Sequence, residues 1–339
     1  MYACLSIKIC FKKTLHDCNN FSIIAHILLH EGALMNAVHT FFRNIVYTVI
    51  LFFLILLVSC SGGITFTPID GFSDEANSQI KEFLVKMKDY QDRKLAVFDG
   101  DGTVFGQAPH YLADECLYMY AADHPKRKPG IIDKMKTQSN VSLPYVQNRV
   151  HYLSGLTLEE VRNLGDECFK KYYSNKIYPP MKKLIGILMK NGFEVWVVTA
   201  SPEALYQKFL SRELGIPVTH VVGVKSVIKN GVITGRMVQP VPQDHGKMYA
   251  IETFVQDRPQ LVAGNSRGDK EMIEYSSGLK IMVNPDRHVA PDQDMSMADY
   301  AKKHNWLTID IRDVPPEDFP WISSKKYNIR ENKSRKAAE

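Results

Sequence analysis

The stretch from Lys94 to Gly106, KLAVFDGDGTVFG, decides the fold of this chain. Its apolar run LAVF predicts a buried strand of a parallel sheet, because strands covered on both faces are continuously hydrophobic. Such a strand brings Asp99 and Asp101 to the carboxyl edge of the sheet, where open α/β folds place their ligand sites. Adjacent carboxylates repel, so the pair fits a shared cation or a division of acid and base work. Asp-Gly-Asp-Gly also forms good turns, and that interpretation remains open on these residues alone.

Apolar runs and helical patterns alternate after this strand. Further strands are predicted at 194–199, 218–222, 260–263 and 279–283, and helices at 73–90, 181–190, 202–214 and 247–255. Lys229-Asn230-Gly231 predicts a hairpin turn within 224–237, and Pro179-Pro180 predicts a break before a helix. The alternation is typical of a Rossmann-like α/β fold, a parallel sheet with helices on both faces. Amphipathic pieces at 112–122 and 158–173 predict a helical cap inserted after the first core strand, over the site.

These patterns divide the chain into successive parts. The predicted organisation is a leader of doubtful translation at 1–34, a lipoprotein signal peptide at 35–60, a tether and N-terminal helix at 61–91, a core domain at 92–106 and 178–290, a helical cap at 107–177, and a C-terminal extension with a basic tail at 291–339.

The segment from Met35 to Cys60 has the order of a secretory signal. A basic start at Arg43 precedes an apolar run of about 14 residues and a small-residue boundary, which is too short for a membrane span. The ending Leu57-Val58-Ser59-Cys60 resembles a bacterial lipoprotein signal, which implies a lipid anchor on Cys60 and membrane contact through it. The expected location is the periplasmic face of a bacterial membrane, or the soluble periplasm. An uncleaved N-terminal anchor is the alternative.

Composition excludes several classes of protein. The hydrophobic content of 45% and charged content of 23% are those of a globular protein with one large domain or two smaller ones. A net charge of +5 gives no nucleic-acid footprint, and the basic stretch from Lys325 to Lys336 is typical of a solvated tail. Cys116 and Cys168 are the cysteines of the folded part, and they can pair or remain buried thiols. The cysteine and histidine spacing predicts no zinc site.

Four separated motifs each end a predicted strand or open a predicted helix. They are Asp99-Gly-Asp101-Gly-Thr103, Val198-Thr199-Ala200-Ser201, Gly246-Lys247 and Gly264-Asn265-Ser266-Arg267-Gly268-Asp269. In order and type they resemble the signature motifs of the haloacid dehalogenase (HAD) superfamily of phosphohydrolases, over residues 92 to 290. The hairpin around Asn230-Gly231, and Arg149-Val150 within the cap, resemble its phosphoserine-phosphatase-like branch.

The resemblance implies a phosphomonoester hydrolase that works through an aspartyl-phosphate. Asp99 is the expected nucleophile, because a covalent intermediate divides one difficult step into two easier ones. Asp101 is the expected acid, protonating the leaving oxygen, and then the base that activates water. Thr199 is expected to donate to a phosphoryl oxygen, and Lys247 to neutralise charge on the aspartate and the transferring group. Taken alone, Thr199 is more typical of a helix cap, and Lys247 of a solvated helix residue.

Main-chain groups and a metal ion complete the expected phosphate site. The amides from Gly100 to Gly102 and the helix opening at Ala200 are expected to donate to phosphate oxygens. Mg²⁺ is expected to contact the first motif, through an Asp99 carboxylate oxygen and the Asp101 carbonyl, and the fourth motif, through Asn265 and Asp269. The superfamily usually has an aspartate where this chain has Asn265, and the missing charge predicts weaker metal binding.

The cap carries the candidates for substrate recognition. Arg149 matches the position at which phosphoserine phosphatases hold a substrate carboxylate. The glutamate that this branch places nine residues after its nucleophile is Ala108 here, so recognition of the serine amine is not implied. Glu115 and the tyrosines, Tyr111 among them, could instead surround a quaternary ammonium group such as that of phosphocholine, or simply form the core of the cap.

The expected substrate is a small phosphorylated metabolite. Two other functions remain open on the sequence. One is a phosphotransferase of the same fold, and the other is a non-catalytic lipoprotein that binds phosphate, which only Asn265 supports.

Overall fold

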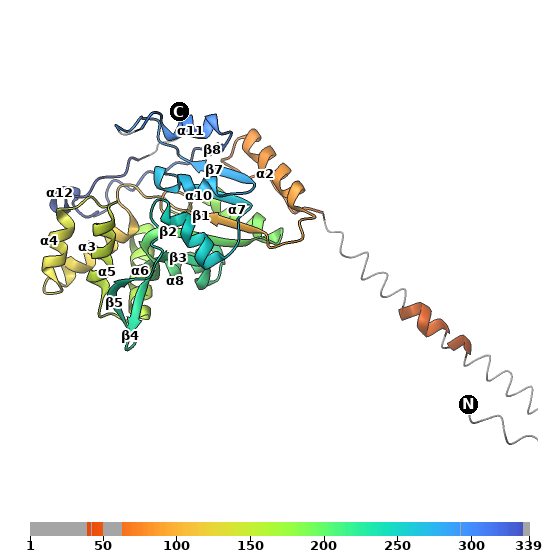
Figure 1. Ribbon diagram of the computed structural model, residues 1–339, viewed down its shortest axis with the longest axis horizontal. Coiled ribbons are helices and arrows are strands. Elements are labelled where there is room, and N and C mark those ends of the chain that lie inside the picture. The colour runs from red at the N-terminus through yellow and green to blue at the C-terminus, as the bar shows by residue number, and fades with distance from the viewer. Residues whose placement is uncertain (1–38, 42, 50–62, 292, 335–339) are drawn as a thin grey trace, which may run out of the picture. The chain divides into compact units, whose positions relative to one another are not determined.

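The computed structural model describes residues 39–41, 43–49, 63–291 and 293–334 (Figure 1). The chain forms two units, residues 1–63 and 64–339, and the sheet lies in the second. In the first unit, residues 39–41 and 43–49 are helical. The predicted leader and Cys60 lie outside the described residues, as does most of the predicted signal peptide. Within the described part, no helix is both long enough and apolar enough to cross a bilayer.

A parallel sheet forms the centre of the second unit, as predicted, and it has six strands. Its strand order is β3-β2-β1-β6-β7-β8, and a separate antiparallel hairpin pairs β4 with β5. The strands are β1 (Leu95–Phe98), β2 (Glu194–Pro202), β3 (Val221–Val224), β4 (Ser226–Lys229), β5 (Val232–Met237), β6 (Leu261–Gly264), β7 (Leu279–Val283) and β8 (Leu307–Ile309).

The helices are distributed along the whole unit. They are α2 (Asp74–Met87), α3 (Leu112–Asp123), α4 (Pro129–Lys136), α5 (Leu143–Leu153), α6 (Leu158–Cys168), η1 (Phe169–Tyr173), α7 (Pro179–Lys190), α8 (Glu203–Leu214), η2 (Val218–His220), α9 (Gly246–Ala250), η3 (Ile251–Val255), η4 (Arg267–Asp269), α10 (Lys270–Glu274), α11 (Met297–Lys303) and α12 (Ser324–Tyr327).

The sheet is buried on both faces, which explains the unbroken apolar run in β1. Ala96 and Phe98 belong to one core cluster, together with side chains of α2, α7 and α8. Leu95 and Val97 point to the opposite face and pack with side chains of α9, α10 and α11. Because successive strand residues alternate between faces, a strand covered on both sides must be apolar throughout.

Local signals place several element ends where the sequence predicts them. The Ser73 side chain accepts a hydrogen bond from Ala76 N and caps α2. Gly215 ends α8 in the left-handed region, with φ 71°. Asn230 and Gly231, with φ 52° and 78°, form the turn of the hairpin.

Three local predictions are wrong in detail. Pro179 and Pro180 do not break the chain before a helix but form the first turn of α7, where a missing N–H costs nothing. The third strand begins at Val221 rather than Val218, because 218–220 form the single turn η2. The short strand β8 lies in the C-terminal extension, for which no strand was predicted.

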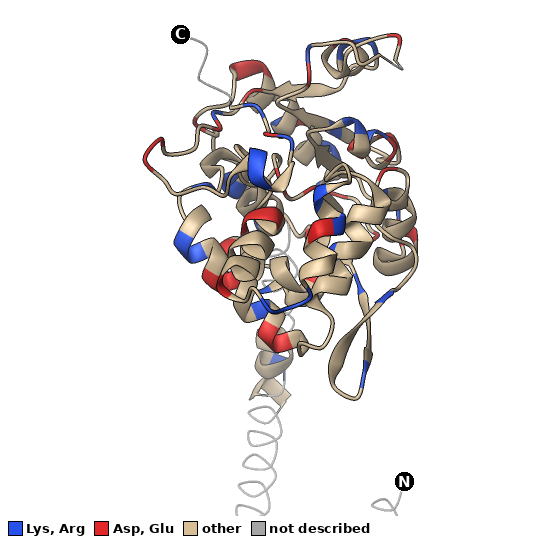
Figure 2. Cartoon of the chain, turned by 90° about the vertical axis from the view of Figure 1, so that its left-hand side faces the viewer, with Lys and Arg blue, Asp and Glu red and all other residues tan. Residues whose placement is uncertain are grey.

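Between β1 and α7 the chain forms the helices α3 to α6 and the π-helical turn η1, the insert predicted as a cap. A disulfide joins Cys116 on α3 to Cys168 at the end of α6, which settles the choice between paired and free thiols. The helices of the insert carry acidic and basic residues interspersed with one another on the face shown in Figure 2.

The C-terminal strap, residues 311–332, connects the sheet to the insert. Asp313 Oδ2 accepts hydrogen bonds from the main-chain N–H groups of Gln107 and Ala108, at 2.8 and 3.0 Å. Asp313 Oδ1 pairs with Lys176 Nζ at 2.7 Å. Both chain segments that enter and leave the insert are therefore held by one buried carboxylate.

The far end of the strap packs on the insert itself. Tyr327 of α12 stacks on Tyr118 of α3 with ring centroids 4.1 Å apart, and Asn328 Nδ2 donates to the carbonyl of Lys136 at the end of α4. Figure 1 shows α12 beside α3 and α4. The start of the predicted basic tail is thus packed rather than solvated, although Lys325 and Lys326 themselves are exposed.

Candidate active site

The carboxyl ends of three neighbouring strands bring the predicted motifs together. Asp99 follows β1, its N–H donates to the carbonyl of Ala263 on β6 at 2.9 Å, and Asn265 follows β6. Thr199 lies on β2, beside β1. These three motifs thus reach one edge of the sheet because parallel strands all end on the same side, and Lys247 reaches the same edge from the start of α9.

Lys247 lies between two carboxylates at this edge. Its Nζ is 2.5 Å from Asp99 Oδ1 and 2.5 Å from Asp269 Oδ1, and all three side chains are buried. Asp269 Oδ2 accepts from the N–H groups of Asn265 and Ser266, at 3.0 and 2.9 Å. Asp269 therefore orients both the lysine and the loop that follows β6.

The protonation behaviour of these groups follows from burial and from this shared lysine. Burial, and then the charge of Asp269, raises the pKa of Asp99 to about 7 although Lys247 opposes the shift. Burial also acts to raise the pKa of Asp269, but Lys247 and the N–H donors of the loop hold it below its ordinary value. Lys247 itself is buried, yet the two carboxylates raise its pKa, so the lysine stays charged.

The second aspartate has a different environment. Both oxygens of Asp101 contact the hydroxyl of Tyr206, at 2.9 and 2.8 Å, and Leu112 N–H donates to Oδ1 at 3.4 Å. Burial raises the pKa of Asp101 to about 6, with the Tyr206 hydrogen bond opposing the shift. A carboxyl with this pKa can give and take a proton near neutral pH.

Three oxygen-bearing groups converge next to the first motif. The amide of Asn265 places one polar atom 3.2 Å from both Asp99 Oδ2 and the main-chain oxygen of Asp101. With the amide oxygen at this point, three acceptors face one another, as around a hard cation; with the nitrogen there, the amide donates to the other two. Thr103 Oγ1 donates to Asp99 Oδ2 at 3.1 Å. One carboxylate, one carbonyl and one amide oxygen are suitable partners for Mg²⁺, so the residues fit this ion.

This set differs from a cluster of acidic or imidazole ligands. No group of three or more His, Cys, Asp or Glu side chains forms a metal site within the described residues. Asp269 was predicted to contact the metal, but its oxygens are already engaged by Lys247 and by the N–H groups of its own loop.

Glycine is required at Gly102 by both space and conformation. Its φ is +81°, and a Cβ there would lie 2.1 Å from Asn265 Nδ2. The Gly102 N–H donates to the carbonyl of Phe105 at 2.7 Å, so in this conformation it is engaged within its own loop, and its role as a phosphate donor stays a prediction. A Cβ on Gly100 would lie 3.7 Å from Thr199 Oγ1, which places the Thr199 hydroxyl against the first motif.

Thr199 is not a helix cap. Its Oγ1 accepts a hydrogen bond from Ser201 N at 3.2 Å, and α8 begins after Pro202 without a side-chain cap. Ala200, predicted to line the helix opening, is half-buried between them.

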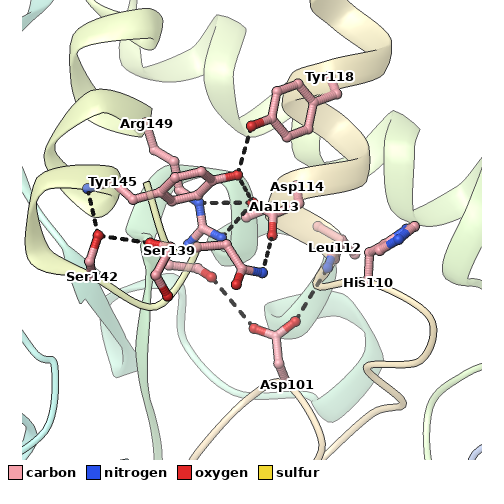
Figure 3. Close-up of polar contacts among 12 residues, drawn as sticks. Asp101, His110, Leu112, Ala113, Asp114, Tyr118, Ser139, Ser142, Tyr145 and Arg149 are labelled. Carbon is pink, nitrogen blue, oxygen red and sulfur yellow. Dashed lines mark hydrogen bonds and ion pairs between the residues drawn. The ribbon is translucent and has the colours of Figure 1, made fainter. Parts of the chain in front are cut away.

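Arg149 and Glu115, two of the three substrate residues predicted in the insert, are paired within the protein. Arg149 Nη2 and Nε are 2.5 and 3.1 Å from Asp114 Oδ1, and Tyr145 donates to the same oxygen at 2.9 Å (Figure 3). Arg149 is 3% exposed and Asp114 is fully buried. The charge that was predicted to hold a substrate carboxylate is therefore neutralised by Asp114, a partner that the sequence pattern did not identify.

Glu115 and Tyr111 lie one turn apart at the start of α3, where Glu115 N–H donates to the carbonyl of Tyr111. Glu115 Oε1 is 2.5 Å from His110 Nδ1, and its Oε2 accepts from Ile322 N–H in the strap, so the carboxylate is not free for an ammonium group. Burial and the nearby charge of Asp101 raise the pKa of Tyr111. Tyr111, like Arg149, therefore lies close enough to Asp101 for their charges to interact.

The fold and the site define an α/β enzyme with buried carboxylates and a lysine at the carboxyl edge of its sheet. This chain belongs to the haloacid dehalogenase-like hydrolase family, whose family model matches residues 96–274 of the 339.

Individual relatives are distant. The chain is 26% identical to a putative hydrolase, ML2424, of Mycobacterium leprae (strain TN) over 166 residues, and 25% identical to phosphoserine phosphatase SerB1 of Mycobacterium tuberculosis (strain H37Rv) over 166 residues. These matches cover 48% of this chain and span about half the length of the relatives, 51% and 50%. A solved structure from Anaerococcus prevotii DSM 20548, of a conserved protein of unknown function, has a TM-score of 0.53 at 14% identity. The match covers 70% of this chain and 92% of that one, and it supports the fold.

Proposed function

We propose that this protein is a Mg²⁺-dependent phosphomonoester hydrolase that forms an aspartyl-phosphate on Asp99. The observation that carries the proposal is the buried trio at the sheet edge, with Lys247 Nζ 2.5 Å from both Asp99 and Asp269, next to a second aspartate of raised pKa. Family membership and the match to a phosphoserine phosphatase support it.

Two steps account for the roles of the aspartates. In the first, an Asp99 oxygen bonds to phosphorus while the ester P–O bond breaks, and protonated Asp101 gives its proton to the leaving oxygen, which departs as an alcohol. In the second, Asp101 takes a proton from water, the resulting hydroxide bonds to phosphorus, and the bond to Asp99 breaks to release inorganic phosphate. Lys247 stabilises the negative charge that passes between Asp99 and the phosphoryl oxygens.

A divalent cation would be held by Asp99, the carbonyl of Asp101 and Asn265. When bound, it neutralises charge on the phosphate and keeps Asp99 ionised as a nucleophile. The remaining work belongs to the protein. Thr103 fixes one oxygen of Asp99 by donating to Oδ2 at 3.1 Å, and Lys247 fixes the other. An orientation defined at both oxygens brings the nucleophile close to its target at low entropic cost.

The substrate we propose is a small organic phosphate. The insert lies against the acid Asp101, because Leu112 at the start of α3 donates to it, and such a covered site suits a compact ester. The Asp114–Arg149 pairing argues against a requirement for a substrate carboxylate, since the guanidinium already has an anionic partner.

The test is to trap the covalent intermediate. Purified protein with Mg²⁺ is expected to hydrolyse 4-nitrophenyl phosphate, and beryllofluoride is expected to inhibit it by forming an adduct on Asp99 that a crystal structure can show. Asp99→Asn is expected to abolish turnover and adduct formation with an unchanged thermal midpoint within about 2 °C, since the change is isosteric. Wild-type turnover by Asp99→Asn would refute the covalent mechanism.

The same assay separates the alternative functions. Added glycerol would divert product from inorganic phosphate to glycerol phosphate if the protein were a phosphotransferase. A protein that binds phosphate without turnover at any Mg²⁺ concentration would be the non-catalytic lipoprotein.

We also propose that the protein works outside the cytoplasm, as a lipoprotein anchored through Cys60 or as a soluble periplasmic protein. The Cys116–Cys168 disulfide supports an oxidising compartment, where such bonds persist. The lipid anchor rests on the sequence of residues 35–60 alone.

A further inference from the structure

Tyr206 makes the shortest contacts to the Asp101 carboxylate among the described residues. Its hydroxyl is 2.9 Å from Oδ1 and 2.8 Å from Oδ2, whereas the Ser201 hydroxyl lies 3.5 Å from Oδ2. The residue belongs to none of the four motifs. It lies in the first turn of α8, seven residues after Thr199, and its side chain is fully buried.

The position of the Tyr206 ring is fixed by aromatic packing. Its centroid is 5.9 Å from that of Phe105, which follows the first motif, and 5.5 Å from that of Phe209, one turn further along α8. A buried ring between two others has little freedom to rotate out, so the hydroxyl is held against Asp101.

The hydroxyl also connects Asp101 to the insert. Ala113 N–H, near the start of α3, donates to the Tyr206 oxygen at 3.3 Å, and the neighbouring Leu112 N–H donates to Asp101 Oδ1 at 3.4 Å. Because its lone pair accepts from α3, the hydroxyl directs its own proton to the carboxylate. Having one proton, it serves one carboxylate oxygen at a time and leaves the other free to carry the acid proton.

We propose that Tyr206 is a positioning residue for the acid Asp101: it orients the carboxyl toward the leaving group and makes that orientation depend on the first turn of α3. This inference rests on the proposed function, in which Asp101 protonates the leaving oxygen. Tyr206 does not touch the phosphate in it.

The proposal predicts an effect that depends on the leaving group. An alkoxide needs a proton as its bond to phosphorus breaks, whereas 4-nitrophenolate is stable without one. A misplaced acid therefore slows hydrolysis of an alkyl phosphate much more than that of 4-nitrophenyl phosphate. A general loss of structure slows both alike.

The experiment compares Tyr206→Phe with Tyr173→Phe. Tyr173 is a matched control, because its buried hydroxyl donates to the carbonyl of His110 at 2.8 Å and its ring packs against Phe105, but it does not contact Asp101. We expect Tyr206→Phe to lower kcat/KM for glycerol phosphate by about 10²-fold and for 4-nitrophenyl phosphate by less than about threefold. Tyr173→Phe is expected to change the two rates by the same factor.

Equal losses on the two substrates in Tyr206→Phe, or no loss on either, would overturn the inference while the wild-type activity left the proposed function intact. A wild-type protein inactive on both substrates would contradict the proposed function instead. Crystal structures of the two variants then test the positioning role of Tyr206 without relying on activity. A rotated Asp101 carboxylate in Tyr206→Phe alone supports it, and an unmoved one overturns it.

Discussion

This protein has two buried clusters of charged side chains, one in the insert and one at the sheet edge. They differ in whether the protein alone supplies every hydrogen-bond and ion-pair partner. In the insert, Asp114 accepts hydrogen bonds from Arg149, Tyr145 and Asn140, so the protein itself provides the partners of this carboxylate. At the sheet edge, Asp99 Oδ2 and the Asp101 carbonyl face the Asn265 amide, and these acceptors are satisfied either by a cation next to the amide oxygen or by a turned amide whose nitrogen donates to both. The comparison teaches that burial and charge alone do not mark a binding site. A site is marked by acceptors or donors that the protein leaves without a complete set of partners.

The largest expected effect tests the insert. Arg149→Met would leave Asp114 buried with its charge unpaired, and we expect the free energy of unfolding to fall by about 3–5 kcal/mol, measured by urea denaturation. The control is Arg287→Met at the exposed pair Arg287–Asp310, where the loss is expected to be below about 1 kcal/mol. Equal losses in the two variants would show that the Asp114–Arg149 pair is not a structural unit.

Lys247→Met tests the sheet edge, and here the expected loss is in turnover. Removing the cation that serves the nucleophile is expected to lower kcat by about 10²- to 10³-fold. Stability should fall less than in Arg149→Met, because Asp269 keeps the N–H donors of Asn265 and Ser266, and the pKa of Asp99, raised to about 7, lets this carboxyl take up a proton near neutral pH. Kinetics with 4-nitrophenyl phosphate and thermal denaturation measure the two effects. A Lys247→Met variant that loses stability but keeps its turnover rate would show that Lys247 has a structural role and not a catalytic one.

Much of the fold follows from the sequence because the core is periodic and its turns are chemically specific. The apolar runs of β1, β2, β6 and β7, the caps at Ser73 and Gly215 and the Asn230-Gly231 turn all act locally. The strand β8 could not be predicted in this way, because three residues carry too little periodicity and the strand forms only by pairing with β7.

The same difference between local and long-range signals explains which residues of the candidate site the sequence predicted. Asp99, Asp101, Lys247 and Asn265 were found because each lies in a motif at a strand end or, for Lys247, at the start of a helix. The Asp114–Arg149 pair was missed because its partners are 35 residues apart on different helices, and sequence spacing carries no record of such a contact. Tyr206 was missed because a tyrosine on the buried face of a helix normally signals core packing.

The smallest expected effect concerns the metal. Asn265→Asp adds a negative charge to the converging oxygens, and we expect Mg²⁺ to bind about tenfold more tightly, the equivalent of about 1.4 kcal/mol. Calorimetric titration of Mg²⁺ measures this, with Asn230→Asp in the exposed hairpin turn as the control for added charge. Unchanged Mg²⁺ affinity in Asn265→Asp would show that residue 265 does not bind the metal. The polar groups of the sheet edge would then, like those of the insert, find their partners within the protein.

The C-terminal strap has a consequence for the order of events during synthesis. Asp313 is synthesised 137 residues after Lys176, and Gln107 and Ala108 are made earlier still. Its carboxylate nevertheless binds all three residues. Until residues 311–332 leave the ribosome, the insert lacks the attachment through Asp313, and its two entry points are joined only by main-chain hydrogen bonds such as Gly106 N–H to the carbonyl of Lys176. We therefore expect the insert of the growing chain to be held less firmly over the sheet edge until the last residues of the strap are made.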